Sequence, residues 1–215
     1  MTDFRQEFID FAIQRKVLCF GEFKTKAGRL SPYFFNADLF NDGESLQKLG
    51  QFYAKAIIAA GVEFDMLFGP AYKGIPLVAA VAIALAERGR NVPFCFNRKE
   101  AKDHGEGGAL IGAPLRGRVL IVDDVISAGT SVRESVELIR LHGAQACGVA
   151  IAIDRMERGS GTLSAVQEVS RNYDMPVISI SDLDSLIGYL QGHPAMAARW
   201  AAIAAYREQY GIRQG

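Results

Sequence analysis

The sequence predicts an α/β fold with a mainly parallel central sheet flanked by helices. From residue 65 to residue 153, short apolar segments alternate with helical segments, which is typical of such folds. Two adjacent acids and a run of small residues follow one apolar segment, at positions 123–131. In open α/β sheets, ligands bind beyond the carboxyl ends of the strands. We therefore expect a binding site at this edge of the sheet.

The N-terminal part of the chain precedes this alternation. Four apolar residues at helical spacing predict an amphipathic helix over residues 3–16. The following segment is rich in aromatic residues and turn formers. It predicts short strands around turns at Ala27–Gly28 and Ser31–Pro32. Ser45 is expected to cap a helix that continues through Ala60.

The alternating part contains five predicted strands and four predicted helices. The strands are expected at Asp65–Gly69, Asn91–Phe96, Val119–Asp123, Ala146–Ile153 and Val177–Ile180. The helices are expected at Gly74–Arg88, Thr130–His142, Asp182–Leu190 and Ala195–Tyr210. Residues 97–118 interrupt the pattern with a charged and then glycine-rich stretch, which predicts a long functional loop. With no repeat or linker, residues 1–215 are expected to form a single domain.

Composition and charge exclude several classes of protein. The formal net charge is zero, which argues against nucleic-acid binding through a general positive field. The longest apolar stretch, Ile75–Ala86, is too short to span a membrane, and the charged N-terminus does not resemble a signal peptide. Cys19, Cys95 and Cys147 are far apart, which suits reduced thiols. We expect a cytoplasmic protein without nucleic-acid or membrane partners.

The strongest motif is VLIVDDVISAGTS, Val119–Ser131. A buried strand ends in Asp123 and Asp124, and small residues then lead into a helix, whose N-terminus favours phosphate. Gly129 lets the backbone approach a ligand closely. The alternative is an ordinary capped turn between a strand and a helix. Two acids buried without partners would be costly, so the motif favours a sugar phosphate site.

Two further features bring positive charge. Arg98, Lys99, Lys102 and His104 are followed by glycines, a composition that suits a mobile lid delivering cations to a leaving group. The alternative is a solvated charged surface. Arg155 comes just after a predicted strand and could bind a carboxylate through two hydrogen bonds, or form a surface salt bridge.

These motifs together resemble a known family. Val119–Ser131 is similar to the binding motif for phosphoribosyl pyrophosphate (PRPP) in type I phosphoribosyltransferases. The runs RKEAKDHGEGG, from Arg98, and KTKAGRLSPYFFN, from Lys24, resemble the catalytic loop and N-terminal segment of orotate phosphoribosyltransferases. The resemblance extends from the N-terminal helix through Arg155. It implies the type I phosphoribosyltransferase fold with a small N-terminal hood over about residues 1–40.

The resemblance also implies roles for individual residues. The two acids would contact the ribose hydroxyls of PRPP, and the following loop would hold its 5′-phosphate. The implied PRPP-binding residues are Lys26, Tyr72, Lys73, Arg98, Lys99, Lys102, His104, Asp123, Asp124, Val125, Ile126, Ser127, Ala128, Gly129, Thr130 and Ser131. Those implied in catalysis are Lys26, Lys99, Lys102, His104, Asp123 and Asp124. Those implied for orotate are Phe34, Phe35, Ser127 and Arg155.

The implied reaction is Mg²⁺-dependent transfer of ribose 5-phosphate from PRPP to orotate, within the synthesis of UMP. Mg²⁺ would be held mainly by PRPP and water, with Asp123 and Asp124 as further candidates. The family forms homodimers with shared sites, in which residues matching Arg98, Lys102 and His104 serve the neighbouring subunit. The resemblance also implies that Tyr72–Lys73 forms the pyrophosphate loop of the PRPP site, with a non-proline cis peptide.

Two alternatives stay open on the residues. A phosphoribosyltransferase for another base would keep Asp123 and Asp124 but should lack the two orotate-like segments. A PRPP-sensing regulator without catalysis would need a nucleic-acid surface, of which the neutral charge balance gives no sign. Ser127 stands where the family often has threonine; the hydroxyl is kept, so we expect no loss of function.

Overall fold

The computed structural model describes residues 3–25, 27–99, 109–159 and 161–212. Its main sheet has six strands in the order β5-β4-β3-β6-β7-β8. The strands are β3 (Met66–Gly69), β4 (Phe94–Asn97), β5 (Leu110–Gly112), β6 (Arg118–Val122), β7 (Gln145–Asp154) and β8 (Val177–Asp182). All neighbouring pairs are parallel except β4 and β5. The predicted α/β fold with a mainly parallel sheet is confirmed.

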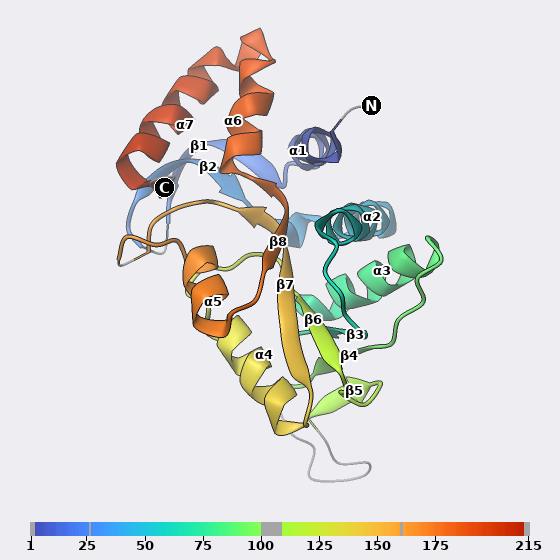
Figure 1. The fold of residues 1–215 in the computed structure, drawn as a ribbon. Helices are drawn as coiled ribbons and strands as arrows, with labels where there is room; N and C mark the ends of the chain where they lie inside the picture. The colour runs from blue at the N-terminus through green and yellow to red at the C-terminus, as the bar shows by residue number, and fades with distance from the viewer. Residues whose placement is uncertain (1–2, 26, 100–108, 160, 213–215) are drawn as a thin grey trace.

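Helices cover both faces of this sheet (Figure 1). On one side lie α1 (Phe4–Gln14), α2 (Gly43–Ala60), α3 (Gly74–Ala86) and α6 (Leu183–Gln191), and on the other lie α4 (Thr130–Leu141) and α5 (Ala165–Tyr173). The chain also forms two short 3₁₀ helices, η1 (Ala37–Leu39) and η2 (Pro194–Met196), and a last helix, α7 (Ala197–Tyr210). Among the residues that the structure describes, no helix is long and apolar enough to cross a membrane.

The apolar strand residues divide between two cores because successive strand side chains point to opposite faces. Leu67 and Leu120 belong to the core under α2 and α3, whereas Phe68 and Ile121 belong to the core under α4 and α5. All four side chains are fully buried. A sheet that is buried on both faces explains why these strands are apolar throughout.

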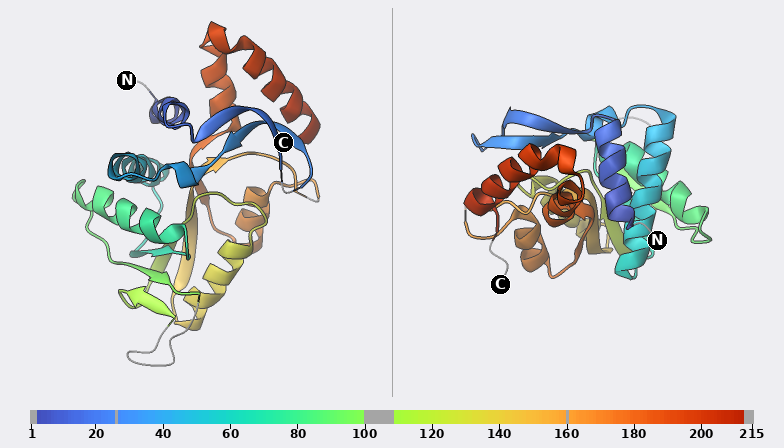
Figure 2. Two further views of the ribbon diagram at one scale, coloured as in Figure 1. Left: turned by 180° about the vertical axis from the view of Figure 1, so that it is seen from behind. Right: turned by 90° about the horizontal axis from the view of Figure 1, so that it is seen from above.

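A separate two-stranded sheet is formed by β1 (Leu18–Lys24) and β2 (Leu30–Phe35), which pair antiparallel. Figure 2 shows this hairpin alongside α7. The predicted turn at Ala27–Gly28 lies between the strands, and Gly28 adopts a φ of 78°. The predicted turn at Ser31–Pro32 is wrong, because both residues lie inside β2. A strand of a two-stranded sheet has a free edge, where proline is tolerated.

Three local differences from the sequence prediction have simple causes. The N-cap of α2 is Asp42, and Ser45 is the third helical residue of a reciprocal capping box. Strand β5 lies within the segment predicted as a loop, and it has only three residues. Helix α5 was not predicted, because it is short and buries little apolar surface beyond Val169.

The strand order positions the binding edge. Strand β3 pairs with β4 on one side and with β6 on the other. The order of strands along the chain therefore reverses between β3 and β6. In open α/β sheets, this switch point is where loops diverge and ligands bind. The segments that follow β3 and β6 both carry predicted PRPP-binding residues.

Candidate active site

The two acids of the strongest motif directly follow β6. Asp123 and Asp124 are only 7% and 8% exposed. The Asp124 backbone N–H donates to Oδ1 of Asp123 at 2.9 Å, and the Val125 N–H donates to Oδ1 of Asp124 at 2.8 Å. From α2, the Tyr53 hydroxyl donates to the carbonyl of Asp123 at 2.7 Å. Backbone donors thus orient both carboxylates at the switch point, and Tyr53 holds the backbone of Asp123.

The two acids differ in their electrostatic surroundings. Burial, followed by the charge of Asp124, raises the pKa of Asp123 to about 6. Its Oδ2 accepts a hydrogen bond from the Ser131 hydroxyl at 2.8 Å. Asp124 instead pairs with Lys73, whose Nζ lies 2.9 Å from Oδ2 and 3.1 Å from Asp38 Oδ1. One acid has a direct cationic partner, and the other is held by a hydroxyl.

The loop after the acids leads into α4 through Gly129, which adopts a φ of 71° at the N-cap. No side chain caps this helix, so the N–H groups of its first turn are available to an anion. Ser127 and Thr130 are exposed beside it. A β-carbon at position 129 would lie 3.4 Å from Val169 of α5, so α5 supports the loop from behind. Open N–H groups and a left-handed glycine are features that suit the predicted phosphate-binding role.

The loop after β3 is the predicted pyrophosphate loop. The expected non-proline cis peptide is present between Ala71 and Tyr72. The Ala71 N–H donates to the side-chain oxygen of Asn97, at the end of β4, over 2.7 Å. The ring of Tyr72 is 65% exposed, and Lys99 Nζ lies 5.3 Å from its centroid. These contacts connect the pyrophosphate loop to the basic segment that begins at Arg98.

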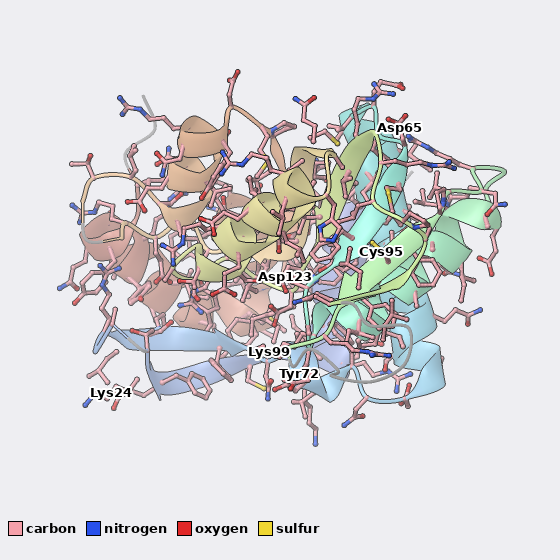
Figure 3. All side chains as sticks on the ribbon, turned by 90° about the horizontal axis from the view of Figure 1, so that it is seen from below. Lys24, Asp65, Tyr72, Cys95, Lys99 and Asp123 are labelled. Atoms are coloured by element: carbon pink, nitrogen blue, oxygen red, sulfur yellow. The ribbon has the colours of Figure 1, made fainter. Side chains whose placement is uncertain are left out.

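A cavity of about 540 Å³ joins three of these segments. It is lined by Phe68, Pro70, Ala71, Asn97, Arg98, Lys99, Thr130, Ser131, Glu134, Ser135 and Leu138. The cavity thus contains two predicted cations and two residues of the predicted phosphate loop. In Figure 3, which shows the molecule from below, Asp123 lies near the centre, Lys99 and Tyr72 lie close together beneath it in the view, and Lys24 lies at the outer end of the hairpin.

Arg155 lies on the other side of the site, directly after β7. Its Nε and one terminal nitrogen donate to Oε1 of Glu157 at 2.9 and 2.5 Å. The same terminal nitrogen donates to the Ser31 hydroxyl of β2 at 3.1 Å. The guanidinium carbon lies 4.4 Å from the centroid of the Tyr33 ring. Arg155 is therefore part of a cluster between β7 and the hairpin, and not a surface salt bridge.

The two aromatic rings predicted to bind orotate occupy different environments. Phe34 is 45% exposed and stacks on Phe23, with centroids 5.5 Å apart. Phe35 is buried and packs between Phe8 and Phe40, at 6.2 and 6.4 Å. Side chains alternate along a strand, so the two neighbours cannot face the same ligand. Phe34 thus lies on the exposed face of β2, and Phe35 lies on the face that meets the core.

Several residues of the site were not found from the sequence. They are Ser31, Tyr33, Asp38, Tyr53, Asn97 and Glu157, each in contact with a predicted site residue or its loop. Only Asn97 carried a local signal, since it follows a predicted strand. Lys26, Lys102 and His104 lie outside the described residues, so their roles stay predictions.

Comparison with known proteins identifies the family. The phosphoribosyl transferase domain family matches residues 37–180. The chain is 70% identical over 213 residues to an orotate phosphoribosyltransferase of Nitrosospira multiformis, covering 99% of this chain and 93% of that protein. It is 66% identical to the enzyme of that name from Thiobacillus denitrificans, covering 99% of this chain and 100% of the relative.

A solved structure agrees with these relatives. The crystal structure of orotate phosphoribosyltransferase from Francisella tularensis matches with a TM-score of 0.86 and 40% identity. The match covers 95% of this chain and 99% of that one. Family, sequence relatives and fold therefore agree over nearly the whole length. The chain belongs to the phosphoribosyltransferase family, in its orotate phosphoribosyltransferase branch.

Proposed function

We propose that this chain transfers ribose 5-phosphate from PRPP to orotate, giving orotidine 5′-monophosphate and pyrophosphate. A bond forms between N1 of orotate and C1 of the ribose, and the bond from C1 to the pyrophosphate oxygen breaks. The product is the precursor of UMP in pyrimidine synthesis. One observation carries the proposal. The buried acids after β6 meet Lys73 of the pyrophosphate loop at the switch point of the sheet, in a chain closely similar to orotate enzymes.

The PRPP half of the site suits a reaction in which positive charge develops on the ribose. Asp123 and Asp124 would accept hydrogen bonds from the ribose hydroxyls and stabilise that charge. Lys73 and Lys99, with the N–H groups of the pyrophosphate loop, would stabilise the negative charge of the leaving pyrophosphate. Preorganised charges in a partly buried site are worth more than the same charges in water. Lys73 already lies between Asp124 and Asp38, so it needs little reorganisation.

The base half of the site suits a planar anion. Arg155 would bind the carboxylate of orotate, and the Phe34–Phe35 segment would hold the flat base. Ser127 would add a hydroxyl from the phosphate loop. Because orotate is already an anion, no strong general base is needed.

Mg²⁺ is the proposed cofactor. Among the described residues, no group of three or more acids, cysteines or histidines is arranged to hold a metal ion. Asp124 is already paired with Lys73, and Asp123 accepts from Ser131. We propose an ion held mainly by PRPP and water, with Asp123 and Asp124 as further candidates. When bound, the ion would neutralise charge on the pyrophosphate.

We also propose a homodimer with shared active sites. Arg98, Lys102 and His104 would serve the neighbouring subunit, and Lys26 and Lys99 their own. Mixing inactive Lys26→Ala and Lys102→Ala subunits should then restore activity, because some mixed dimers contain one intact site. Subunit exchange that is demonstrated directly, without recovery of activity, would contradict shared sites.

The remaining features of the proposal concern organisation and location. The hairpin β1–β2 with α1 would act as a hood, over about residues 1–40, on a single domain of residues 1–215. The cytoplasm is the proposed location. The three cysteines are free, which suits a reducing compartment.

The direct test is an ultraviolet assay of orotate consumption with PRPP and Mg²⁺, with uracil and hypoxanthine as parallel bases. Consumption of orotate that requires both PRPP and Mg²⁺ would support the proposal. Turnover of another base but not of orotate would keep the PRPP half and reject the base half. Binding of PRPP without any turnover would favour a regulator.

A further inference from the structure

The guanidinium of Arg155 already has a carboxylate partner in the protein itself. Two of its nitrogens donate to a single oxygen of Glu157. The Arg155 side chain is 24% exposed and the Glu157 side chain 15% exposed. Charge-assisted hydrogen bonds of a largely desolvated pair are among the stronger interactions in proteins. Any carboxylate that binds Arg155 must therefore compete with a pre-existing one.

The position of Glu157 is fixed from outside the base site. Its backbone forms an isolated bridge with Gly211, just after α7. The neighbouring Met156 carbonyl accepts from the Ile212 N–H at 2.9 Å. The C-terminal segment thus holds the backbone that carries Glu157, and the Glu157 side chain reaches back to Arg155, two residues earlier. Glu157 can give up Arg155 by a side-chain rotation alone.

A second polar group lies beside the Glu157 carboxylate. Tyr206 of α7 is 5% exposed. Burial raises its pKa, and the negative charge of Glu157 raises it further, so its phenol stays protonated. Among the described residues, its buried hydroxyl has no hydrogen-bond partner. Its ring packs edge-on against Tyr33, at 6.4 Å, under Arg155. Tyr206 is therefore a donor available to Glu157 when Arg155 turns to a ligand.

We propose that Glu157 is an internal competitor for the substrate carboxylate: it occupies Arg155 in the empty site and yields when the orotate group binds. This rests on the proposed role of Arg155. Glu157 keeps the guanidinium neutralised and in place between turnovers, and it weakens the binding of both orotate and the product. It is a positioning residue that lowers affinity so that the product can leave.

The test compares ligands with and without the carboxylate. Orotidine 5′-monophosphate and uridine 5′-monophosphate differ only in that group, and calorimetric titration measures both without turnover. Glu157→Gln keeps the size and an acceptor oxygen but removes the charge. It should bind orotidine 5′-monophosphate about tenfold more tightly than the unmodified protein, with unchanged affinity for uridine 5′-monophosphate. The KM for orotate should fall while the KM for PRPP does not change.

A matched control is Glu208→Gln, which makes the same chemical change at an exposed position of α7 and should alter neither affinity. If Glu157 served only to hold Arg155 in place, its substitution would weaken binding. Tighter or weaker binding therefore distinguishes competition from a purely structural role. Unchanged or weaker binding of orotidine 5′-monophosphate would overturn the proposal, and so would equal tightening of both nucleotides. Glu157→Ala removes the charge without placing an amide, and it provides the same test if the first variant folds poorly.

Arg155→Gln separates this proposal from the role of Arg155. Suppose the unmodified protein prefers the carboxylated nucleotide and Arg155→Gln loses that preference. In that case, if Glu157→Gln fails to tighten binding, only the proposal that Glu157 competes with the ligand is rejected, and the role of Arg155 stands. If Arg155→Gln leaves the preference intact, the assignment of the base half fails first, and the competitor falls with it.

Discussion

The two halves of the proposed active site are built in different ways. In the PRPP half, the acids, the phosphate loop and the start of α4 come from one segment of nine residues, 123–131. In the base half, Arg155 contacts Ser31, which lies 124 residues earlier in the chain. Segment 156–158 is held in turn by the residues after α7.

The charges of the two halves also differ. In the PRPP half, Asp123 lacks a direct cationic partner among the described residues, and burial raises its pKa to about 6. In the base half, Arg155 is paired with Glu157. The PRPP half therefore holds charge at the expense of stability, whereas the base half is neutralised until a ligand arrives. The difference suggests variants that act on one half and not on the other.

The largest effect is expected from Asp124→Asn. It removes the negative charge that faces the ribose and leaves Lys73 with only the exposed Asp38. The value of kcat/KM for PRPP should fall about 10²- to 10³-fold, as measured by steady-state assay. Asp174→Asn, at the exposed end of α5, makes the same change and should have no effect. A similar loss of kcat/KM in Asp174→Asn would mean that the assay reports a loss of folded protein rather than the role of Asp124.

A smaller and more selective effect is expected from Arg155→Gln. The KM for orotate should rise about 10- to 100-fold, because a charge-assisted hydrogen bond is lost, while the KM for PRPP stays the same. The single variant also leaves Glu157 without its cation, which should lower the thermal midpoint. Adding Glu157→Gln should recover the midpoint but not the KM. Equal rises in both KM values would contradict independent halves.

The third effect concerns pH. Protonation of Asp123 should lower kcat/KM as the pH falls through about 6. Because the pKa is raised in the folded state, ionised Asp123 destabilises the fold above pH 6, and this cost disappears below its ordinary pKa. Asp123→Asn should therefore stabilise the protein by about 2 kcal/mol at pH 8 while reducing activity. Thermal unfolding should be measured at pH 8, where Asp123 is ionised, and at pH 3.5, where it is protonated. A gain in stability that persists at pH 3.5 would show that the gain does not come from removing the charge of Asp123.

The smallest effect is expected from Ser127→Thr. The side chain is exposed in the phosphate loop, and threonine keeps the hydroxyl. The value of kcat/KM should change by less than about threefold, which corresponds to well under 1 kcal/mol. Ser127→Ala tests the hydroxyl itself, since it should weaken binding where Ser127→Thr does not. Equal effects of the two variants would show that the hydroxyl has no role in binding.

The sequence by itself determined the fold class and most of the PRPP half. Buried strands are apolar throughout, and glycine, small residues and hydroxyls favour a particular turn, so these features depend on interactions between near neighbours. Strand β6, the acids, the phosphate loop and α4 could be predicted for this reason. Short elements such as β5 and α5 could not be, because they are stabilised mainly by contacts with distant segments.

Only the tertiary structure decided which groups neutralise the buried charges. The sequence gives no sign that Lys73 lies between Asp38 and Asp124, or that Ser31 and Glu157 hold Arg155. Nor does it show that Phe35 is buried in the core while Phe34 is exposed. The partner of a buried charge depends on which segments pack against it, and packing joins residues far apart in the chain.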